Sequence, residues 1–208
     1  MEVLPLAFTS GWASGINAYA TTLILGLLGR FAGFSQIPEG LQRTDVLIVM
    51  AVLTVLEVVA DKIPYLDSIW DTVSTIIRPV IGAVIGALLA GANGDLWTIT
   101  LAAVGGVTAL LSHLTKAGLR LAINTSPEPA TNIGASVFGD VSVVGATVGV
   151  VLFPIPVAII TAVVLVIGLV VLVRSAGRVR KGWRGFRDWQ RRRRAGSTSA
   201  EGRDETDG

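Results

Sequence analysis

The stretch from Glu57 to Arg78, EVVADKIPYLDSIWDTVSTIIR, places charged residues directly beside apolar runs that are long enough to lie in a lipid bilayer. It contains four acids and two bases. An ionisable group inside a membrane costs about 2.5–3.5 kcal/mol on insertion scales, and by default it indicates a functional site with a nearby partner. The fold must therefore either pair these charges or open a polar path to them.

The composition is that of a multi-pass membrane protein. Of 208 residues, 51% are hydrophobic and 15% are charged, and the mean hydropathy of +0.67 is too high for an ordinary soluble domain. The N-terminal MEVLPLAF lacks the basic region of a cleavable signal peptide, so we expect it to remain as part of the first helix. With no cysteine and one histidine, the chain has no residues for disulfides, thiolate metal sites or multi-histidine metal sites.

Apolar runs predict the membrane crossings, because a helix of roughly 20 apolar residues spans a bilayer core of about 30 Å. We expect an all-α fold, a polytopic membrane helix bundle of about six spans. Polar residues interrupt two of the runs, so four or five spans with one re-entrant segment also fit. The same runs suit two inverted three-helix halves with short or re-entrant segments near 64–78 and 124–140. The six expected spans are 6–29, 45–62, 76–92, 97–121, 133–153 and 155–173.

Basic residues are concentrated near the C-terminus. Residues 1–173 hold 6 Lys/Arg and 10 Asp/Glu, a net charge of −4, whereas residues 174–208 hold 11 and 5, a net charge of +6. Because Lys and Arg near span ends stay on the cytoplasmic side, we expect a multi-pass protein of the cell membrane with its C-terminus inside. Six spans would place the N-terminus inside as well.

The charge division predicts a membrane-embedded helical domain over 1–173, a basic juxtamembrane segment over 174–194 and a disordered polar tail over 195–208. The basic segment is expected to bind anionic lipid headgroups of the bilayer, and we expect no nucleic-acid partner. The basic residues expected to face lipid are Arg178, Arg180, Lys181, Arg184 and Arg187.

Two acids of the second expected span, Glu57 and Asp61, lie one helical turn apart on the same face. Two carboxylates this close can carry a proton or bind a cation, so we expect them to be ion or proton sites. The alternative is structural: Asp61 and Lys62 end the helix at the interface, and a base on another span neutralises Glu57. Asp67 and Asp71 lie on the polar face of the amphipathic segment that follows, where they would form a cytoplasmic acidic mouth.

The fourth expected span supplies a basic face. His113, Lys116 and Arg120 follow helical spacing, so we expect them, together with Lys62, to be counter-charges to the acids of the second span. This pairing would solve the cost of burial without requiring transport.

Further polar residues are candidates for a path through the bundle. Asn17 belongs to a polar stripe with Ser10, Ser14 and Thr21, and Asp140 interrupts the fifth span. The stripe equally suits hydrogen bonding between packed helices. Small-residue patterns at Gly82-xxx-Gly86 and Gly145-xxx-Gly149 predict close helix packing and permit a homo-oligomer. If the NTSPEP segment re-enters the membrane, the secondary candidates for binding a cation or polar substrate are Asn124, Thr125 and Glu128.

The chain contains, in order, SGWASGINAY, EVVADKIPYLDSIWD, IRP, SHLTKAGLRLAINTSPEPATN and FGDVSVVG. Over roughly residues 5–173 this set resembles a membrane family, domain of unknown function 4126. The combination of ADKIPxxD with a downstream KAGxRxxxNTSPEP carries most of the specificity. The resemblance implies a multi-pass integral membrane protein, and it implies no activity, substrate or catalytic residue.

The leading hypothesis is a small transporter or channel for a proton, a cation or a small polar solute. The alternative is a non-transporting membrane scaffold or adaptor with internally paired charges and a basic tail that binds lipid or a partner. The chain lacks GxSxG, HExxH, a Walker loop and a dinucleotide-binding GxGxxG after a strand. We therefore expect no enzymatic activity, no cofactor and no metal.

Overall fold

The computed structural model describes residues 3–61, 63, 66–91, 94–124 and 129–174, and every regular element in these ranges is a helix, as predicted. The chain divides into two compact units, Met1–Leu169 and Val170–Gly208, and the first is described below. Several predicted functional residues lie outside the described residues, either wholly or for their side chains: Lys62, Asp67, Asn124, Thr125, Glu128 and the basic residues of 175–208.

The first expected span, 6–29, is broken into two helices, α1 (Val3–Ile16) and α2 (Ala18–Ala32). Asn17 lies between them with φ −150° and ψ 99°, and its Oδ1 accepts a hydrogen bond from the backbone N–H of Ala20 at 2.9 Å. A short polar side chain in this position caps the free N–H groups of the next helix. The prediction of a single uninterrupted span was therefore wrong here, and Asn17 caps the second helix.

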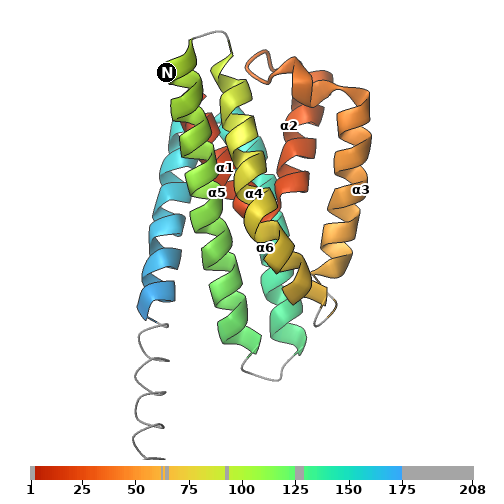
Figure 1. Ribbon diagram of the computed structural model, residues 1–208, viewed down its shortest axis with the longest axis vertical. Coiled ribbons are helices and arrows are strands. Elements are labelled where there is room, and N and C mark those ends of the chain that lie inside the picture. The colour runs from red at the N-terminus through yellow and green to blue at the C-terminus, as the bar shows by residue number, and fades with distance from the viewer. Residues whose placement is uncertain (1–2, 62, 64–65, 92–93, 125–128, 175–208) are drawn as a thin grey trace, which may run out of the picture. The chain divides into compact units, whose positions relative to one another are not determined.

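We interpret α1 and α2 as a re-entrant hairpin. Leu6 near the start of α1 and Leu25 in the middle of α2 belong to one hydrophobic cluster, so both helices extend from Asn17 toward the same end of the bundle. At 1.5 Å per residue, the 14 and 15 residues give lengths of about 21 and 22 Å, which is shorter than a bilayer core of about 30 Å. Asn17 at the tip is only 1% exposed, so the tip lies inside the bundle. Figure 1 shows the two helices that it joins, α1 and α2.

The remaining helices are η1 (Glu39–Gln42), α3 (Thr44–Ala60), α4 (Leu66–Ala90), α5 (Asp95–Asn124) and α6 (Pro129–Leu152), followed by a helix over Pro154–Arg174. Helix α4 runs without interruption through Pro79, so the amphipathic segment and the third expected span are one helix. The described parts of the stretches expected to be re-entrant, 66–78 and 129–140, are likewise continuous helix. The discontinuous element is the first expected span instead.

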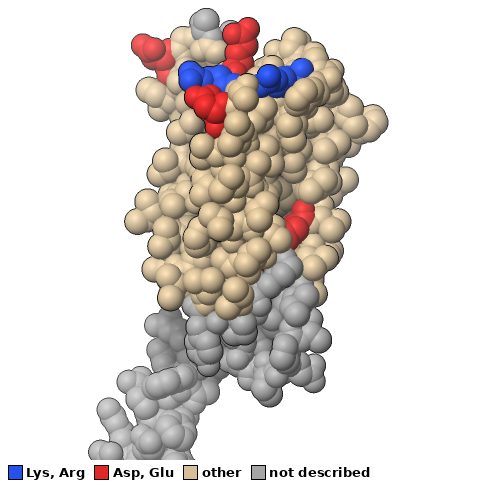
Figure 2. Space-filling model, turned by 90° about the vertical axis from the view of Figure 1, so that its right-hand side faces the viewer, with Lys and Arg blue, Asp and Glu red and all other residues tan. Residues whose placement is uncertain are grey.

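Within the described part of the chain, four helical segments are long and apolar enough to cross a membrane: Ile69–Ala90, Asp95–Arg120, Gly134–Leu152 and Pro154–Arg174. Helix α3, with 17 residues, also presents apolar side chains outward, among them Ile48, Val52 and Val55. Exposed apolar surface on this scale is typical of a protein solvated by lipid. Figure 2 shows most acids and bases of this face gathered at one end of the described surface, above a broad, mostly uncharged area with one further acidic patch lower down.

Glycines bring α1, α4 and α5 close together. A Cβ atom on Gly105 of α5 would clash with the carbonyl oxygen of Gly82 of α4, and one on Gly86 would clash with that of Leu101. The predicted close packing at Gly82-xxx-Gly86 is therefore confirmed. For Gly145-xxx-Gly149 the outcome is divided: a Cβ atom on Gly145 would meet nothing within 4 Å, whereas one on Gly149 would lie 3.1 Å from Cγ2 of Val157.

Candidate functional site

Three helices bring seven ionisable side chains into one buried group, which we term the charge cluster. It comprises Glu57 and Asp61 at the end of α3, Asp71 and Arg78 of α4, and His113, Lys116 and Arg120 of α5. Glu57 is fully buried, and Asp61, Arg78 and His113 are each 1% exposed. Buried charges of this kind are tolerated only when they are paired and hydrogen-bonded.

Glu57 is paired with Arg78. Nη2 of Arg78 lies 2.5 Å from Oε1 of Glu57. Arg78 was not among the predicted site residues, although the sequence places it seven residues after Asp71 on the polar face of the same helix. This contact matches the structural alternative considered from the sequence, in which a base on another span neutralises Glu57.

His113 accepts a hydrogen bond from Arg78 and does not act as a counter-charge. Nη1 of Arg78 lies 2.7 Å from Nδ1 of His113. Because a guanidinium can only donate, Nδ1 is the acceptor and the ring proton is on Nε2, which lies 2.9 Å from Oγ1 of Thr75. Thr75 in turn donates to the backbone carbonyl of Asp71 at 2.9 Å. The geometry thus assigns a neutral His113, which corrects its predicted role.

Asp61 is shared by two bases of α5. Its Oδ2 lies 2.9 Å from Nζ of Lys116 and 3.2 Å from Nη2 of Arg120, and its Oδ1 accepts from Nη1 of Arg120 at 3.3 Å. The expected pairing of the second and fourth spans is confirmed for this acid.

Asp71 joins the two halves of the charge cluster. Its Oδ2 lies 3.0 Å from Nη1 of Arg120, and its Oδ1 lies 3.6 Å from Nη1 of Arg78. Asp71 is only 9% exposed, so it belongs to the interior network and not to an open acidic mouth. Three carboxylates and three permanent bases are therefore joined in one network that is neutral in sum.

The tip of the α1–α2 hairpin is bound to the same network. Helix α1 ends with carbonyls that have no partner within the helix, and this end carries the negative pole of the helix dipole. Arg78 donates to the carbonyl of Gly15 at 3.3 Å, and Lys116 donates to that of Ile16 at 2.9 Å. Gly15 allows this approach, since a Cβ there would clash with the carbonyl of Ala109. The helix break and the charge cluster are thus one structural unit.

Some buried polar atoms of the cluster have no hydrogen-bond partner among the described residues. They are Oε2 of Glu57, Oδ1 of Asp71 and Nε of Arg78. An unpaired buried polar atom costs about 1–3 kcal/mol, so each marks a position where a proton, a water molecule or a moving partner would be stabilised.

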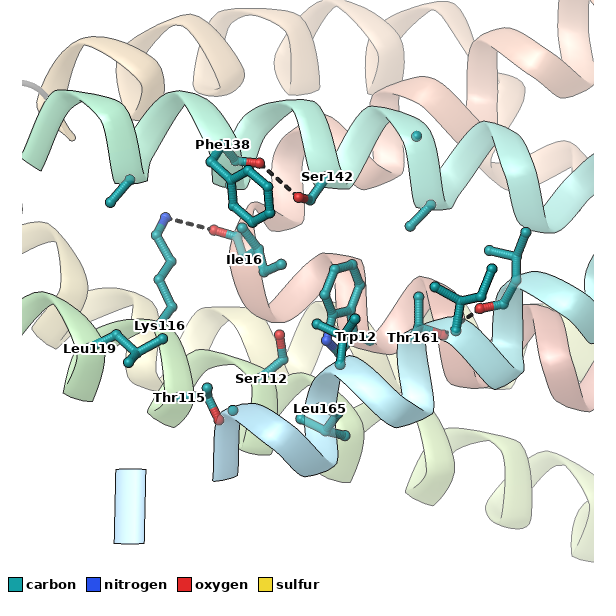
Figure 3. A pocket seen from close by; sticks show the side chains of 18 of the residues that line it. Trp12, Ile16, Ser112, Thr115, Lys116, Leu119, Phe138, Ser142, Thr161 and Leu165 are labelled. Atoms are coloured by element: carbon teal, nitrogen blue, oxygen red, sulfur yellow. Dashed lines mark hydrogen bonds between the residues drawn. The ribbon is translucent and has the colours of Figure 1, made fainter. Parts of the chain in front are cut away.

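A cavity of about 580 Å³ lies beside the cluster, between α1, α5, α6 and the helix that begins at Pro154. Its wall is mainly apolar. Figure 3 shows Lys116 and Leu119 at one end and Thr161 toward the other, with Trp12 and Phe138 between them. Lys116 and Arg120 are the charged residues of the described wall, and it includes no carboxylate. The cavity therefore reaches the basic side of the cluster, whereas Glu57 and Asp61 lie behind it.

Two other predicted path residues are not members of the charge cluster. Asn17 caps α2, and Asp140 lies half-buried on α6; neither forms part of the described cavity wall. Among the described residues, no group of three or more His, Asp or Glu side chains is arranged to hold a metal ion.

The helical bundle, its apolar exterior and its buried charge cluster define a membrane-like helical protein. The chain belongs to the family described as Domain of unknown function (DUF4126), which matches residues 4–174 and confirms the resemblance found in the sequence. No curated protein and no solved structure matches the chain.

Proposed function

We propose that the chain is a membrane transport protein in which a proton or small polar solute moves past the charge cluster. The observation that carries this proposal is the re-entrant hairpin, whose tip at Asn17 ends against the cluster and beside a cavity. Transporters build their binding sites from discontinuous helices whose ends meet near the bilayer midplane. Non-helical backbone is tolerated at that depth where it is buried or lines a cavity.

The network supports a proton or polar solute better than a metal cation. Each carboxylate of the charge cluster already has a basic partner, and bases at the same place repel a cation. Asp61 is the expected switch, because Lys116 and Arg120 share it. A proton on Asp61 would weaken both ion pairs at once and release Lys116, which also binds the tip of the hairpin.

Proton flux into liposomes tests this proposal. The protein is reconstituted with a pH-sensitive dye trapped inside, and a potassium gradient with valinomycin drives proton entry. We expect wild-type flux well above that of empty liposomes, and a reduction of about tenfold or more in Asp61→Asn. Asp45→Asn is the matched control, because Asp45 forms an exposed ion pair with Arg43 at the start of α3 and its replacement should leave flux unchanged.

A second variant separates transport from folding. Removing one member of a buried ion pair leaves an uncompensated charge, whereas removing both is far less destabilising. Asp61→Asn/Lys116→Met therefore keeps the charge balance of the cluster. If this variant folds and loses flux, the proposal is supported. If it carries wild-type flux, or if folded wild type is no more permeable than empty liposomes to protons and a panel of small solutes, transport past the cluster is rejected.

The second candidate is a non-transporting scaffold, and the neutral sum of the charge cluster favours it. In this case the ion pairs hold the bundle together, and the basic tail binds anionic lipid or a partner. Deleting residues 175–208 would abolish binding to vesicles rich in phosphatidylglycerol and leave flux absent, as in the full chain. We propose no enzymatic role, since the carboxylates are occupied by bases rather than set beside a nucleophile.

A further inference from the structure

The cavity beside the charge cluster has the form of a ligand site. Its volume of about 580 Å³ falls within the range of about 300–1,000 Å³ typical of small-molecule sites. Gly145 lies in its wall, and a Cβ atom there would meet nothing within 4 Å. Trp12, Phe138 and Leu165 give it an aromatic and aliphatic wall. Such a wall suits an aliphatic body rather than a hydrated ion.

The charged side chains in the described wall of the cavity are both basic and lie at its polar end. Lys116 and Arg120 lie in the wall, whereas their partner Asp61 is 1% exposed and lies outside it. Two cations at one end of an apolar cavity are complementary to a compact anion.

Lys116 has a donor to offer. An ammonium group has three N–H donors. Two of them are accounted for by Oδ2 of Asp61 and the carbonyl of Ile16, both at 2.9 Å, and the described residues supply no third acceptor. The side chain keeps 14% exposure, and Figure 3 shows it extending across the cavity end from α5 toward Ile16. An anionic head placed there would gain a charge-assisted hydrogen bond without displacing Asp61.

We propose that this cavity binds a single-chain amphipathic anion, a long-chain carboxylate, with its head at Lys116 and Arg120 and its aliphatic chain along Trp12 and Phe138. The proposal concerns binding and does not depend on transport. A neutral lipid would leave the two bases without a new partner, and a cationic amphiphile would be repelled by them.

The position of Trp12 allows a direct test. A full-length variant with Trp12 as its sole tryptophan, the other four being replaced by Phe, is placed in phosphatidylcholine nanodiscs at alkaline pH. Dibromostearate, whose bromines quench tryptophan only at contact range, is then titrated in. We expect saturable quenching of Trp12. The matching brominated alcohol should require a concentration about tenfold higher or more, the scale of a lost charge-assisted hydrogen bond.

A matched pair of variants on α6 localises the ligand. Gly145→Leu fills the cavity and should abolish the saturable quenching. Gly134→Leu makes the same change on the same helix at an exposed position outside the cavity wall, where a Cβ also meets nothing within 4 Å, and it should leave quenching unchanged.

Four results would overturn the proposal. They are equal quenching by the acid and the alcohol, quenching that rises without saturation, saturable quenching that survives Gly145→Leu, and quenching produced only by brominated phosphatidylcholine. The last result would assign the cavity to a bilayer lipid chain rather than to a free carboxylate.

Discussion

Arg78 and Glu57 form the most deeply buried ion pair of the described chain, with Nη2 and Oε1 2.5 Å apart and side-chain exposures of 1% and 0%. The pair joins α4 to α3. Arg78 also donates to His113 of α5 and to the carbonyl of Gly15 of α1. One guanidinium on α4 therefore contacts three other helices, and we expect its loss to destabilise the whole bundle.

The first prediction concerns this pair. Glu57→Gln leaves the charge of Arg78 buried without its main partner, so we expect it to lower the free energy of unfolding by about 3–5 kcal/mol. Replacing both residues, as in Glu57→Gln/Arg78→Met, should cost much less than the sum of the single changes. Denaturant unfolding in mild detergent, followed by circular dichroism, measures both effects. Asp45→Asn, at an exposed pair, should stay within about 0.5 kcal/mol of wild type. If the double variant instead loses as much unfolding free energy as the two single variants together, the two side chains are not coupled.

The second prediction concerns the helix break. Asn17→Ala removes the acceptor for the N–H of Ala20 and should destabilise the protein by about 1 kcal/mol, up to about 2. Asn17→Ser keeps a capping oxygen and should stay close to wild type. Thermal unfolding of the three proteins in the same detergent makes the comparison. An Ala variant as stable as wild type would mean that the cap does not hold the hairpin tip.

Part of the charge cluster could be predicted from the sequence because helical faces are local. The spacing of Glu57 and Asp61, and of Lys116 and Arg120, follows from 3.6 residues per turn, and the Asp61 pairs confirmed it. Arg78 was missed for the opposite reason. Its pairing with Glu57 depends on α3 lying against α4, a tertiary relationship that periodicity does not encode.

The re-entrant hairpin was missed because two structures fit the same residues. An asparagine in an apolar run suits the polar stripe of one long helix as well as the cap between two short ones. Only its extended backbone and the bond to Ala20 separate the two cases. The all-α bundle itself was predictable, because apolar runs of bilayer length leave few alternatives to helices.

The third prediction concerns topology. Because the α1–α2 hairpin returns to the side from which it enters, the start of α1 and the loop before η1 should face the same side of the membrane. This replaces the expectation from six crossing spans, which put the N-terminus opposite that loop. The chain has no cysteine, so Leu4→Cys, Ser35→Cys and Ile63→Cys each give a single label site at an exposed position.

On intact cells, a membrane-impermeant maleimide should label both positions 4 and 35 or neither of them. Position 63 lies beyond the far end of α3 and should give the other result. Labelling of all three positions after membrane disruption is the control for reactivity. Opposite labelling of positions 4 and 35 would require α1 and α2 to cross the bilayer as one span.

The fourth prediction compares one substitution at two glycines within helices. An exposed Gly→Ala change in a helix ordinarily gains up to about 1 kcal/mol of stability. At Gly86 the new Cβ would clash with the backbone of Leu101, so α4 and α5 must separate and we expect a loss of about 1–3 kcal/mol or more. At Gly145 the Cβ would meet nothing within 4 Å, and stability should be unchanged or higher. Denaturant unfolding in detergent measures the difference. Since both changes add the same methyl group, equal effects at the two sites would show that the α4–α5 contact does not depend on glycine.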